Sequence, residues 1–597
     1  MKEILVTVRF VFGAAWRAAP GRISAAILML LLGSISGPFL GVSLKYLTND
    51  ALKGDAHAAT LMGLLTGVLL LSFITLGAFS HHLYFHLSQK MRIDFDEDMT
   101  VLSNGSLGLE QHERADYADR LELLRQDSYI FADSVQPLMV AGTNVVSLIF
   151  IGVLLVQVQP LLLLLPLFAL PPLLGGKWAN AKVENARVET AEAGRLARHL
   201  FSLALEPDAG KELRVFGLQD ELRSRQHALW DSVTRRLLRA QFGGTILHVG
   251  GQLLFALGYV GAVLLVVHDA IAGQRSTSTG DVVLVIALAG QVNQQVGAIV
   301  AVATRVQRLS KAVARLGWLR ELIAELEPTH VPRGHVPARL ERGISLQGVA
   351  FAYPGTETPV LKDVTLDIPA GTTVAIVGEN GAGKTTLVKL LCRFYEPSAG
   401  RILVDGTELR DLEPAAWRAR VSAGFQDFCR YELVVRETVG VGDVPRMGDS
   451  EVVSGALDRA HALDVLEALP DGLETQLGKS YTKGVEISGG QWQKLALGRA
   501  MMRETPLLLV LDEPTAALDA HAEHALFERY AASTRAVAAA AGAITLFISH
   551  RFSTVRMADL ILVIRDGAIV ERGSHEELLA LNGSYAELFS LQASAYR

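Results

Sequence analysis

The motif with the clearest chemistry is the eight-residue run Gly378-Glu379-Asn380-Gly381-Ala382-Gly383-Lys384-Thr385, whose spacing G-x-x-x-x-G-K-[ST] is typical of phosphate-binding loops. A β-rich apolar run precedes it and helical apolar spacing follows it, so the pattern predicts strand, glycine loop and helix. The loop amides and the helix N-terminus would then face the phosphates of a nucleotide, with Thr386 beside them. Lys384 would reach the β and γ phosphates in a binding and catalytic role, and the Thr385 hydroxyl would ligate Mg²⁺.

Two carboxylates follow a second apolar strand further along the chain. Residues 507–511 are predicted to form a buried strand. Asp512 and Glu513 follow it directly, which places both acids at the edge of the phosphate pocket. We expect Asp512 to hold Mg²⁺ through water and Glu513 to orient and polarise an attacking water. Phosphoryl transfer depends mainly on such positioning and charge stabilisation.

A third motif lies about twenty residues before the acidic pair. It is Ile487-Ser488-Gly489-Gly490-Gln491, and a helical pattern over 492–502 follows it. With this motif the chain resembles the ATP-binding cassette (ABC) family. That resemblance implies that Ser488, Gly489, Gly490 and Gln491 contact the γ-phosphate bound on another subunit's loop, which agrees with the positive end of a helix dipole.

Further positions match the same family in order and spacing. The resemblance implies that Tyr353 stacks on adenine, that Gln426 senses Mg²⁺ and contacts the membrane domain, that Asp519 is the aspartate after the acidic pair, and that His550 contacts the γ-phosphate. Taken singly, Tyr353 or His550 would be assigned a structural role. The segment 480–486 departs from the family's usual pattern, so its contacts stay open.

Composition indicates a membrane protein. The chain has 597 residues, of which 50% are hydrophobic, and a mean hydropathy of +0.30, too apolar for a soluble chain of this size. The net charge of −6 gives no basic signature for nucleic acid, so none is expected as a partner. The two cysteines, Cys392 and Cys429, have no metal-binding spacing and are interpreted as reduced thiols.

Six apolar runs are each long enough to cross a bilayer. They lie near 23–44, 58–84, 134–157, 160–178, 243–267 and 282–304. The predicted fold is therefore a two-domain membrane protein, an all-α six-helix transmembrane domain followed by an α/β P-loop NTPase domain. The expected boundaries are an interfacial elbow helix at 1–22, the transmembrane domain at 23–326, a Pro-rich linker at 327–343 and the ATP-binding cassette at 344–597.

Basic residues set the expected orientation. They concentrate in the segments 85–131 and 179–242, which places both termini and the ATPase domain in the cytoplasm of a multi-pass protein of the cytoplasmic membrane. These segments read as helices that continue beyond the bilayer toward a partner surface. The candidate tips are 114–121 and 208–216, where exposed charge surrounds Tyr117 or Phe216 as candidate anchors, and a solvated hairpin is the alternative.

Polar residues within the spans leave two interpretations open. Gln291, Gln294 and Gln295 share one helical face, as do His248 and Gln252, and they could line a translocation cavity or bond between helices. No carboxylate lies in the middle of a span, which argues against a buried acid that selects cations. Glycines 33, 37 and 41 predict close helix packing, and prolines 166, 171 and 172 predict a kink in the fourth span.

Six spans and one cassette resemble a bacterial exporter-type (type IV fold) half-transporter, similar to multidrug, peptide and natural-product exporters. The resemblance implies a homodimer that hydrolyses ATP with Mg²⁺ in membrane lipid and exports an amphipathic antibiotic, peptide or other small molecule. Lipid flipping, ATP-driven import and an ATP-gated channel are alternatives, and a different half-transporter could replace one copy. No peptidase segment precedes the first span, so we expect no leader-peptide cleavage.

Overall fold

The fold was analysed in a computed structural model, which describes residues 2–206, 209–272, 277–326, 334–513, 541–549, 551 and 555–595. The chain divides into two compact units. The first holds residues 1–101 and 122–319, and the second holds residues 102–121 and 320–597. The short segment 102–121, which lies between membrane helices in the sequence, thus belongs to the second unit.

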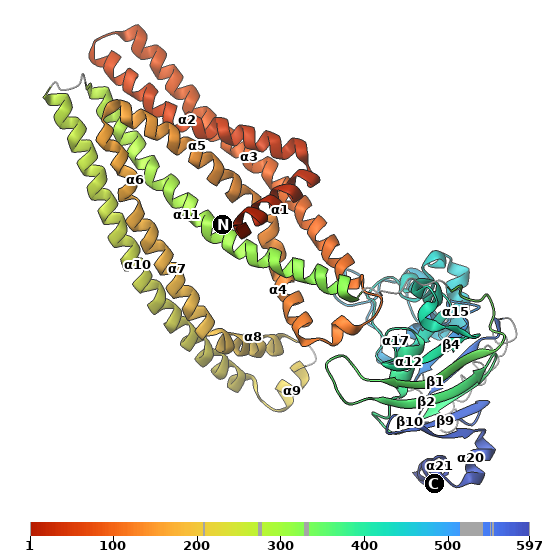
Figure 1. The fold of residues 1–597 in the computed structure, drawn as a ribbon. Helices are drawn as coiled ribbons and strands as arrows, with labels where there is room; N and C mark the ends of the chain where they lie inside the picture. Colours follow the sequence, from red (N-terminus) through yellow and green to blue (C-terminus); the bar gives the residue numbers. More distant parts are fainter. Residues whose placement is uncertain are drawn as a thin grey trace. The chain divides into compact units, whose positions relative to one another are not determined.

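Long helices build the first unit (Figure 1). In chain order they are α1 (Lys2–Ala18), α2 (Pro20–Leu52), α3 (Ala56–Asn104), α4 (Ala115–Ala132), α5 (Val135–Val158), η2 (Pro160–Leu164), α6 (Leu165–Phe168), α7 (Leu170–Glu189), α8 (Ala191–Leu205), α9 (Ala209–Val215), α10 (Gln219–Ile271) and α11 (Thr279–Leu326). The 49 residues of α3 and 53 of α10 far exceed the roughly 20 that cross a bilayer. Both helices therefore continue beyond the hydrocarbon, as predicted.

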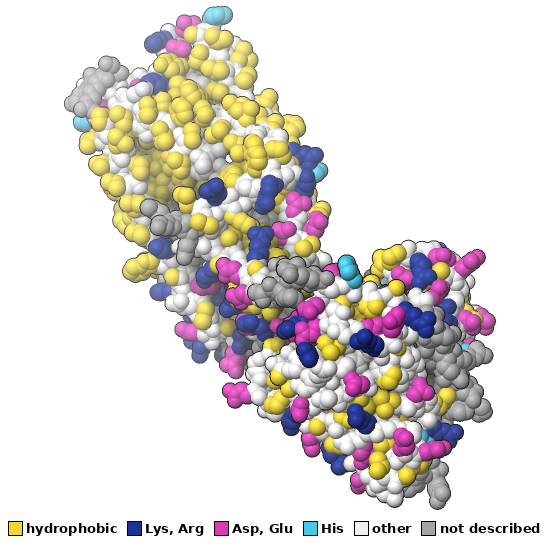
Figure 2. Space-filling view, turned by 45° about the vertical axis from the view of Figure 1, so that its right-hand side comes forward, with side chains coloured by type: hydrophobic (Ala, Val, Ile, Leu, Met, Phe, Trp, Pro, Cys, Tyr) yellow, Lys and Arg dark blue, Asp and Glu magenta, His cyan; other side chains and the backbone are white. Residues whose placement is uncertain are grey.

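Six of these segments are long and apolar enough to span a membrane, which confirms the predicted number. The apolar window of α3 has no buried residue, and Leu64 on it is 66% exposed. Figure 2 shows hydrophobic side chains covering much of the visible face of this helical unit. So large an exposed apolar surface fits lipid as its solvent.

The fourth span is broken, as its prolines predicted. It consists of η2, α6 and α7 in place of one continuous helix, with Pro160, Pro166 and Pro171 each in the first turn of a piece. Proline tolerates that position because its missing N–H has no partner there in any helix. The kink thus follows directly from local sequence.

Glycines on α10 bring it close to α6 and α7, and Figure 1 shows α7 and α10 side by side. A Cβ atom on Gly251 would lie 2.6 Å from the backbone of Pro172, one on Gly244 would lie 2.6 Å from Ala179, and one on Gly258 would lie 2.5 Å from Phe168. These distances are shorter than any real carbon contact. The seven-residue glycine spacing therefore sets how closely the two helices approach.

Gly251→Leu is expected to destabilise the membrane domain by at least about 1–3 kcal/mol, because the added side chain forces α7 and α10 apart. Gly250→Leu is the matched control, since nothing lies within 4 Å of its Cβ position. Thermal unfolding of the two purified variants in detergent measures the difference. Equal melting temperatures would show that the close contact at Gly251 is dispensable.

The polar residues of the spans mostly bond between helices. Gln295 donates to Ser147 at 2.8 Å and Asn293 donates to Gln252 at 3.0 Å. A weaker contact at 3.4 Å joins Gln291 to the carbonyl of Gly37. His248 pairs with the carbonyl of Pro172 at 3.3 Å, whereas the side chain of Gln294 is exposed. Of the two interpretations, hydrogen bonding between helices therefore applies to every one of these polar residues except Gln294. The predicted packing of α2 is also present, with Gly41 against Leu284 and Leu288 of α11.

Within its described residues the second unit contains two sheets (Figure 1). Their strands are β1 (Gly343–Phe351), β2 (Leu361–Pro369), β3 (Thr373–Val377), β4 (Ala399–Val404), β5 (Thr407–Glu408), β6 (Val421–Gly424), β7 (Leu508–Asp512), β8 (Ile544–Ile548), β9 (Leu560–Arg565) and β10 (Ala568–Gly573). One sheet is antiparallel in the order β2-β1-β4-β5. The other has the order β10-β9-β3-β8-β7-β6, and all its pairs are parallel except β9 with β10.

Short helices surround these sheets. They are η1 (Glu110–Glu113), α12 (Lys384–Leu391), η4 (Leu409–Asp411), α13 (Pro414–Arg418), α14 (Val435–Gly440), η5 (Val441–Arg446), α15 (Ser450–Arg459), α16 (Leu463–Glu467), η6 (Gly472–Glu474), α17 (Gly489–Ala500), α20 (His575–Leu581) and α21 (Ser584–Ala595). The helices from α14 to α17 share one apolar core, and β3, β8 and α12 contribute to another. The parallel strands end at one edge, where the loops after β3 and β7 meet.

The first predicted tip, 114–121, is not the end of its segment in the structure. Tyr117 is 1% exposed and its hydroxyl pairs with Ser103 at 2.9 Å, so this tyrosine is buried among protein atoms. Its ring also packs edge-on against His112, because the chain turns back on itself at this point. Residues 105–113 form the end of this segment instead. At the other tip Phe216 is 66% exposed, and residue 208 lies outside the described part of the chain.

Candidate nucleotide site

A cavity of about 390 Å³ opens at the carboxyl edge of the parallel sheet. It is lined by Tyr353, Val360, Asn380, Gly381, Gly383, Lys384, Thr385, Thr386, Gln426, Asp512, Glu513 and Ile548. Twelve of the residues predicted for phosphate, base or metal binding are in the phosphate loop or on this lining. Residues more than a hundred positions apart in the sequence meet at this cavity, because β3 and β7 lie on either side of β8 and run parallel to it.

The loop's backbone explains its glycines. Gly381 and Gly383 have φ of 81° and 105°, in the left-handed region that other residues avoid, and a Cβ on Gly378 would lie 2.2 Å from the carbonyl oxygen of Ile564. Gly383 directly precedes α12, whose first residue is Lys384. Amides of the loop and of this helix end can therefore approach phosphate oxygens without side chains between them.

Lys384 is buried at the loop. Its ammonium donates to the carbonyls of Gly378 at 2.7 Å and Glu379 at 2.8 Å. Burial lowers the pKa of Lys384, and the nearby carboxylates of Glu513 and Asp512 oppose that shift. A partly desolvated cation inside the loop is well placed to bind an anion that enters the cavity.

Thr385 and Asp512 face each other as hard oxygen donors. The Thr385 hydroxyl lies 3.4 Å from Asp512 Oδ2. Burial first, and then the charge of Glu513, raise the pKa of Asp512 to about 6. Two carboxylates and a hydroxyl at one edge of a buried pocket suit a divalent cation, which would offset their mutual repulsion.

The raised pKa predicts a pH dependence for Mg²⁺. Because the Asp512 carboxyl takes up a proton as pH falls through about 6, metal and proton compete there below that pH. Between pH 7 and pH 5, Mg²⁺ affinity of ATP-loaded protein is expected to fall about tenfold more in wild type than in Asp512→Asn. Titrating Mg²⁺ against a fluorescent ATP analogue measures both slopes. Identical slopes would remove Asp512 from the metal site, since the variant retains only the titration of the nucleotide.

Glu513 is held at the end of β7 by three contacts. Its carboxylate accepts from Gln426 Nε2 at 2.7 Å, its carbonyl accepts from Gln493 at 3.2 Å, and its amide donates to the carbonyl of Ile548 at 2.9 Å. Its φ of 47° turns the chain directly after Asp512. The backbone conformation therefore differs between Asp512 and Glu513, which is compatible with a separate role for each acid. Gln493 was missed in the sequence, where it is one of two nearby glutamines with no distinguishing spacing.

The signature motif lies elsewhere in the same chain. Ser488 caps α17 in a reciprocal pair with Gln491, at 2.8 Å and 3.3 Å, and no motif residue from 488 to 491 lines the cavity. The structure thus does not bring this motif to the phosphate loop of its own chain. Asp519 and His550, also predicted for the site, lie outside the described residues.

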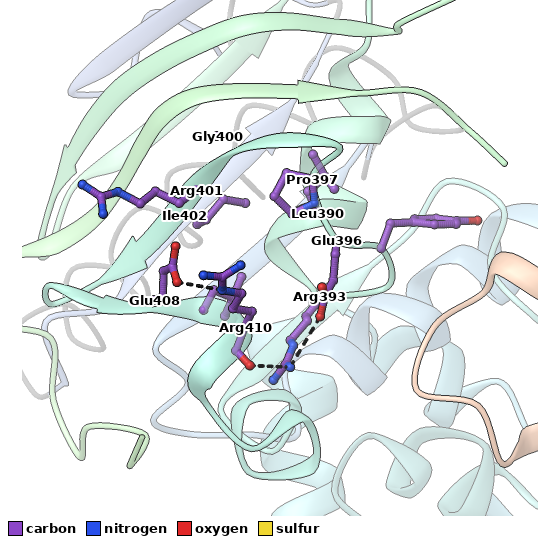
Figure 3. Close-up of a pocket in the computed structure, with 11 residues that line it drawn as sticks. Leu390, Arg393, Glu396, Pro397, Gly400, Arg401, Ile402, Glu408 and Arg410 are labelled. Carbon is purple, nitrogen blue, oxygen red and sulfur yellow. Dashed lines mark hydrogen bonds and ion pairs between the residues drawn. The ribbon is translucent and has the colours of Figure 1, made fainter. Parts of the chain in front are cut away.

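A second cavity of the same unit holds only about 60 Å³, room for a few waters (Figure 3). The arginines that line it are already engaged. Arg393 donates to the carbonyl of Arg410 at 2.8 Å and lies 3.8 Å from Glu396, and Arg410 pairs with Glu408 at 2.7 Å. These bonds anchor the chain that follows α12 and do not form a binding site.

Comparison with known proteins identifies the domain. The ABC transporter family model matches residues 361–516, which include the phosphate loop, the signature and the acidic pair. Residues 361–516 of this chain therefore form an ABC transporter domain. ATP with Mg²⁺ is therefore its nucleotide and metal, as predicted. The glycine loop, Lys384 and the Thr385–Asp512 pair fit both.

Several proteins named ATP-dependent lipid A-core flippase are similar. One from Chromohalobacter salexigens is 36% identical over 57% of this chain and 56% of its own length. One from Thiobacillus denitrificans is 40% identical over 43% of each, and one from Alcanivorax borkumensis is 32% identical over 66% and 65%. The chain spans about half the length of the curated relatives it matches.

A solved structure shows the fold of the whole chain. It is described as a bacterial Atm1-family ABC exporter with ATP bound, and it superposes with a TM-score of 0.76 at 24% identity over 96% of this chain and 98% of that one. The six apolar helices of this chain and the α/β domain that follows them therefore have an exporter-type fold. The predicted exporter-type half-transporter fold is confirmed.

Proposed function

We propose that this ABC protein is an ATP-driven translocase that moves an amphipathic, lipid-like compound across the cytoplasmic membrane as a homodimer. The observation that carries the proposal is that one chain joins six candidate spans to an ATP-binding domain, and that a loop between two spans is bonded to that domain. Leu109 of that loop donates its amide to the carbonyl of Phe394, three residues beyond α12.

The residues have distinct roles in this proposal. Lys384 and the loop amides bind the triphosphate, while Thr385 and Asp512 hold Mg²⁺, with Gln426 as a further oxygen donor beside Glu513. Bound Mg²⁺ neutralises charge on the phosphate oxygens. Glu513 orients and deprotonates the attacking water. Tyr353 stacks on the base, and Ser488 to Gln491 of a second copy complete the site, with Asp519 and His550 beside them.

A lipid-like substrate is preferred to the antibiotic or peptide expected from the sequence. The similar proteins are named lipid A-core flippases, and polar groups in the spans are mostly engaged between helices. An amphipathic lipid needs few buried polar partners, because its apolar part stays in hydrocarbon. We place both termini and the ATP-binding domain in the cytoplasm, with α1 as an interfacial helix on the lipid.

Vesicles that contain purified protein test this function. Fluorescent lipid in one leaflet, a fluorescent drug and a labelled peptide are followed separately with ATP supplied outside. ATP-dependent lipid movement that is lost in Lys384→Ala supports the proposal. Transport of drug or peptide without lipid movement would reassign the substrate, and accumulation on the ATP side would reverse the direction. An ATP-gated ion current without accumulation would replace transport by a channel.

A further inference from the structure

Helix α12 joins the phosphate loop to the segment 102–121 within the second unit. Lys384, Thr385 and Thr386 at its start line the nucleotide cavity. Lys389 lies in its last turn, and Phe394 and Tyr395 follow its end. One short helix thus has the nucleotide cavity at one end and a loop from between α3 and α4 at the other.

Backbone contacts fasten the loop. The amide of Leu109 donates to the carbonyl of Phe394 at 3.1 Å, and a Cβ on Gly108 would lie 2.7 Å from that oxygen. Arg418 donates to the carbonyl of Leu107, and its guanidinium lies 5.4 Å from the ring centroid of Phe394. The loop therefore keeps its place without help from the carboxylate of Glu113.

Glu113 is the loop side chain that reaches α12. Its carboxylate accepts a hydrogen bond from the Tyr395 hydroxyl at 2.7 Å and lies 3.9 Å from Lys389 Nζ. Burial and this carboxylate together raise the pKa of Tyr395, so the phenol stays protonated and donates. A half-exposed ion pair at this distance contributes little stability by itself, so its importance lies in where it holds the ammonium.

The ammonium of Lys389 lies over the ring of Tyr353. The nitrogen is 5.2 Å from the Tyr353 centroid and 5.8 Å from the Tyr395 centroid. Phe351 and Tyr395 pack edge-on against Tyr353, and its hydroxyl pairs with Thr386 at 3.1 Å. The ring is therefore fixed by its edges and by a cation on one face, while it also lines the nucleotide cavity.

We propose that Glu113 is a positioning residue for the base end of the nucleotide site. Through Lys389 and Tyr395 it fixes the Tyr353 ring, so the position of the loop sets the affinity for adenine and leaves the affinity for phosphate unchanged. By reciprocity, adenine on Tyr353 favours the docked loop to the same extent. The proposal rests on the base-stacking role of Tyr353 given under the proposed function, and it does not depend on what is transported.

Equilibrium binding to full-length protein in detergent, without Mg²⁺, tests this linkage. ATP and inorganic tripolyphosphate each compete with a fluorescent ATP analogue. Glu113→Gln and Lys389→Met are each expected to weaken ATP binding about 3- to 10-fold, the range of a partly desolvated cation–π contact. The double variant should bind ATP no more weakly than whichever single variant has the lower ATP affinity, because both substitutions act through the same contact. Tripolyphosphate, which has no base, should bind all of them within about twofold of wild type.

Two variants serve as controls. Glu110→Gln changes a carboxylate in the same loop that lines a different cavity and forms no ion pair within the described residues, so it should bind ATP as wild type does. Lys389→Arg retains a cation over the ring and should restore most of the affinity. Equal weakening of ATP and tripolyphosphate, or equal effects of Glu110→Gln and Glu113→Gln, would overturn the proposal. A protein that binds ATP as expected but moves no lipid would refute the proposed transport alone.

Discussion

Glu513→Gln is expected to lower ATP hydrolysis about 10²- to 10⁴-fold while ATP binding stays close to wild type. With Asp512 assigned to Mg²⁺, Glu513 is the other carboxylate on the described lining and can accept a proton from the attacking water. An amide of the same shape cannot, yet it still fits next to Gln426, which lies 2.7 Å away. The lost activity therefore comes from chemistry, since the loop that binds the triphosphate is untouched.

Phosphate release and equilibrium binding of a fluorescent ATP analogue measure the two effects separately. Glu467→Gln is the matched control, because it makes the same change on the exposed end of α16, away from the cavity. Its hydrolysis should equal that of wild type. Hydrolysis by Glu513→Gln at the wild-type rate would exclude Glu513 as the base, and loss of ATP binding would show a structural role instead.

The nucleotide cavity was predictable because its parts are local in sequence. Each of its motifs requires a backbone form that neighbouring residues specify, such as the left-handed Gly381 and Gly383 before a helix, or an acidic pair that begins at the last residue of the buried strand β7. Parallel strands then bring their carboxyl ends together without further information. The six spans were predictable for a similar reason, since hydropathy over about twenty residues determines them.

Contacts between distant segments were not predictable in this way. In the sequence Tyr117 is a candidate anchor among charged residues, but its burial depends on Ser103 and on how the chain turns at 105–113. Glu113 and Lys389 are 276 positions apart (389 − 113) and have no shared motif, so only the fold brings them to within 3.9 Å of each other. The glycines of α10 are visible in the sequence, but their partner helix is not.

The signature motif makes a prediction about assembly. Residues 488 to 491 do not line the cavity of their own chain, so the proposed homodimer must complete each site with the partner's motif. Two changes would disable opposite halves of a site. Lys384→Ala removes the ammonium at the phosphate loop. Gly489→Asp places a carboxylate at the first turn of α17, where nothing lies within 4 Å of the new Cβ and an acid suits the helix, so the fold is kept while phosphate is repelled.

Heterodimers of these variants distinguish a shared site from a site within one chain. Differently tagged chains are co-expressed and purified over both tags. If sites form between chains, a Lys384→Ala chain paired with a Gly489→Asp chain retains one intact site and about half of wild-type hydrolysis, assuming independent sites. Wild type paired with a chain that carries both changes retains none. A site within one chain gives the reverse, because the first pair then has no intact site and the second has one. Activity in the second pair alone, or in neither pair, would contradict the prediction.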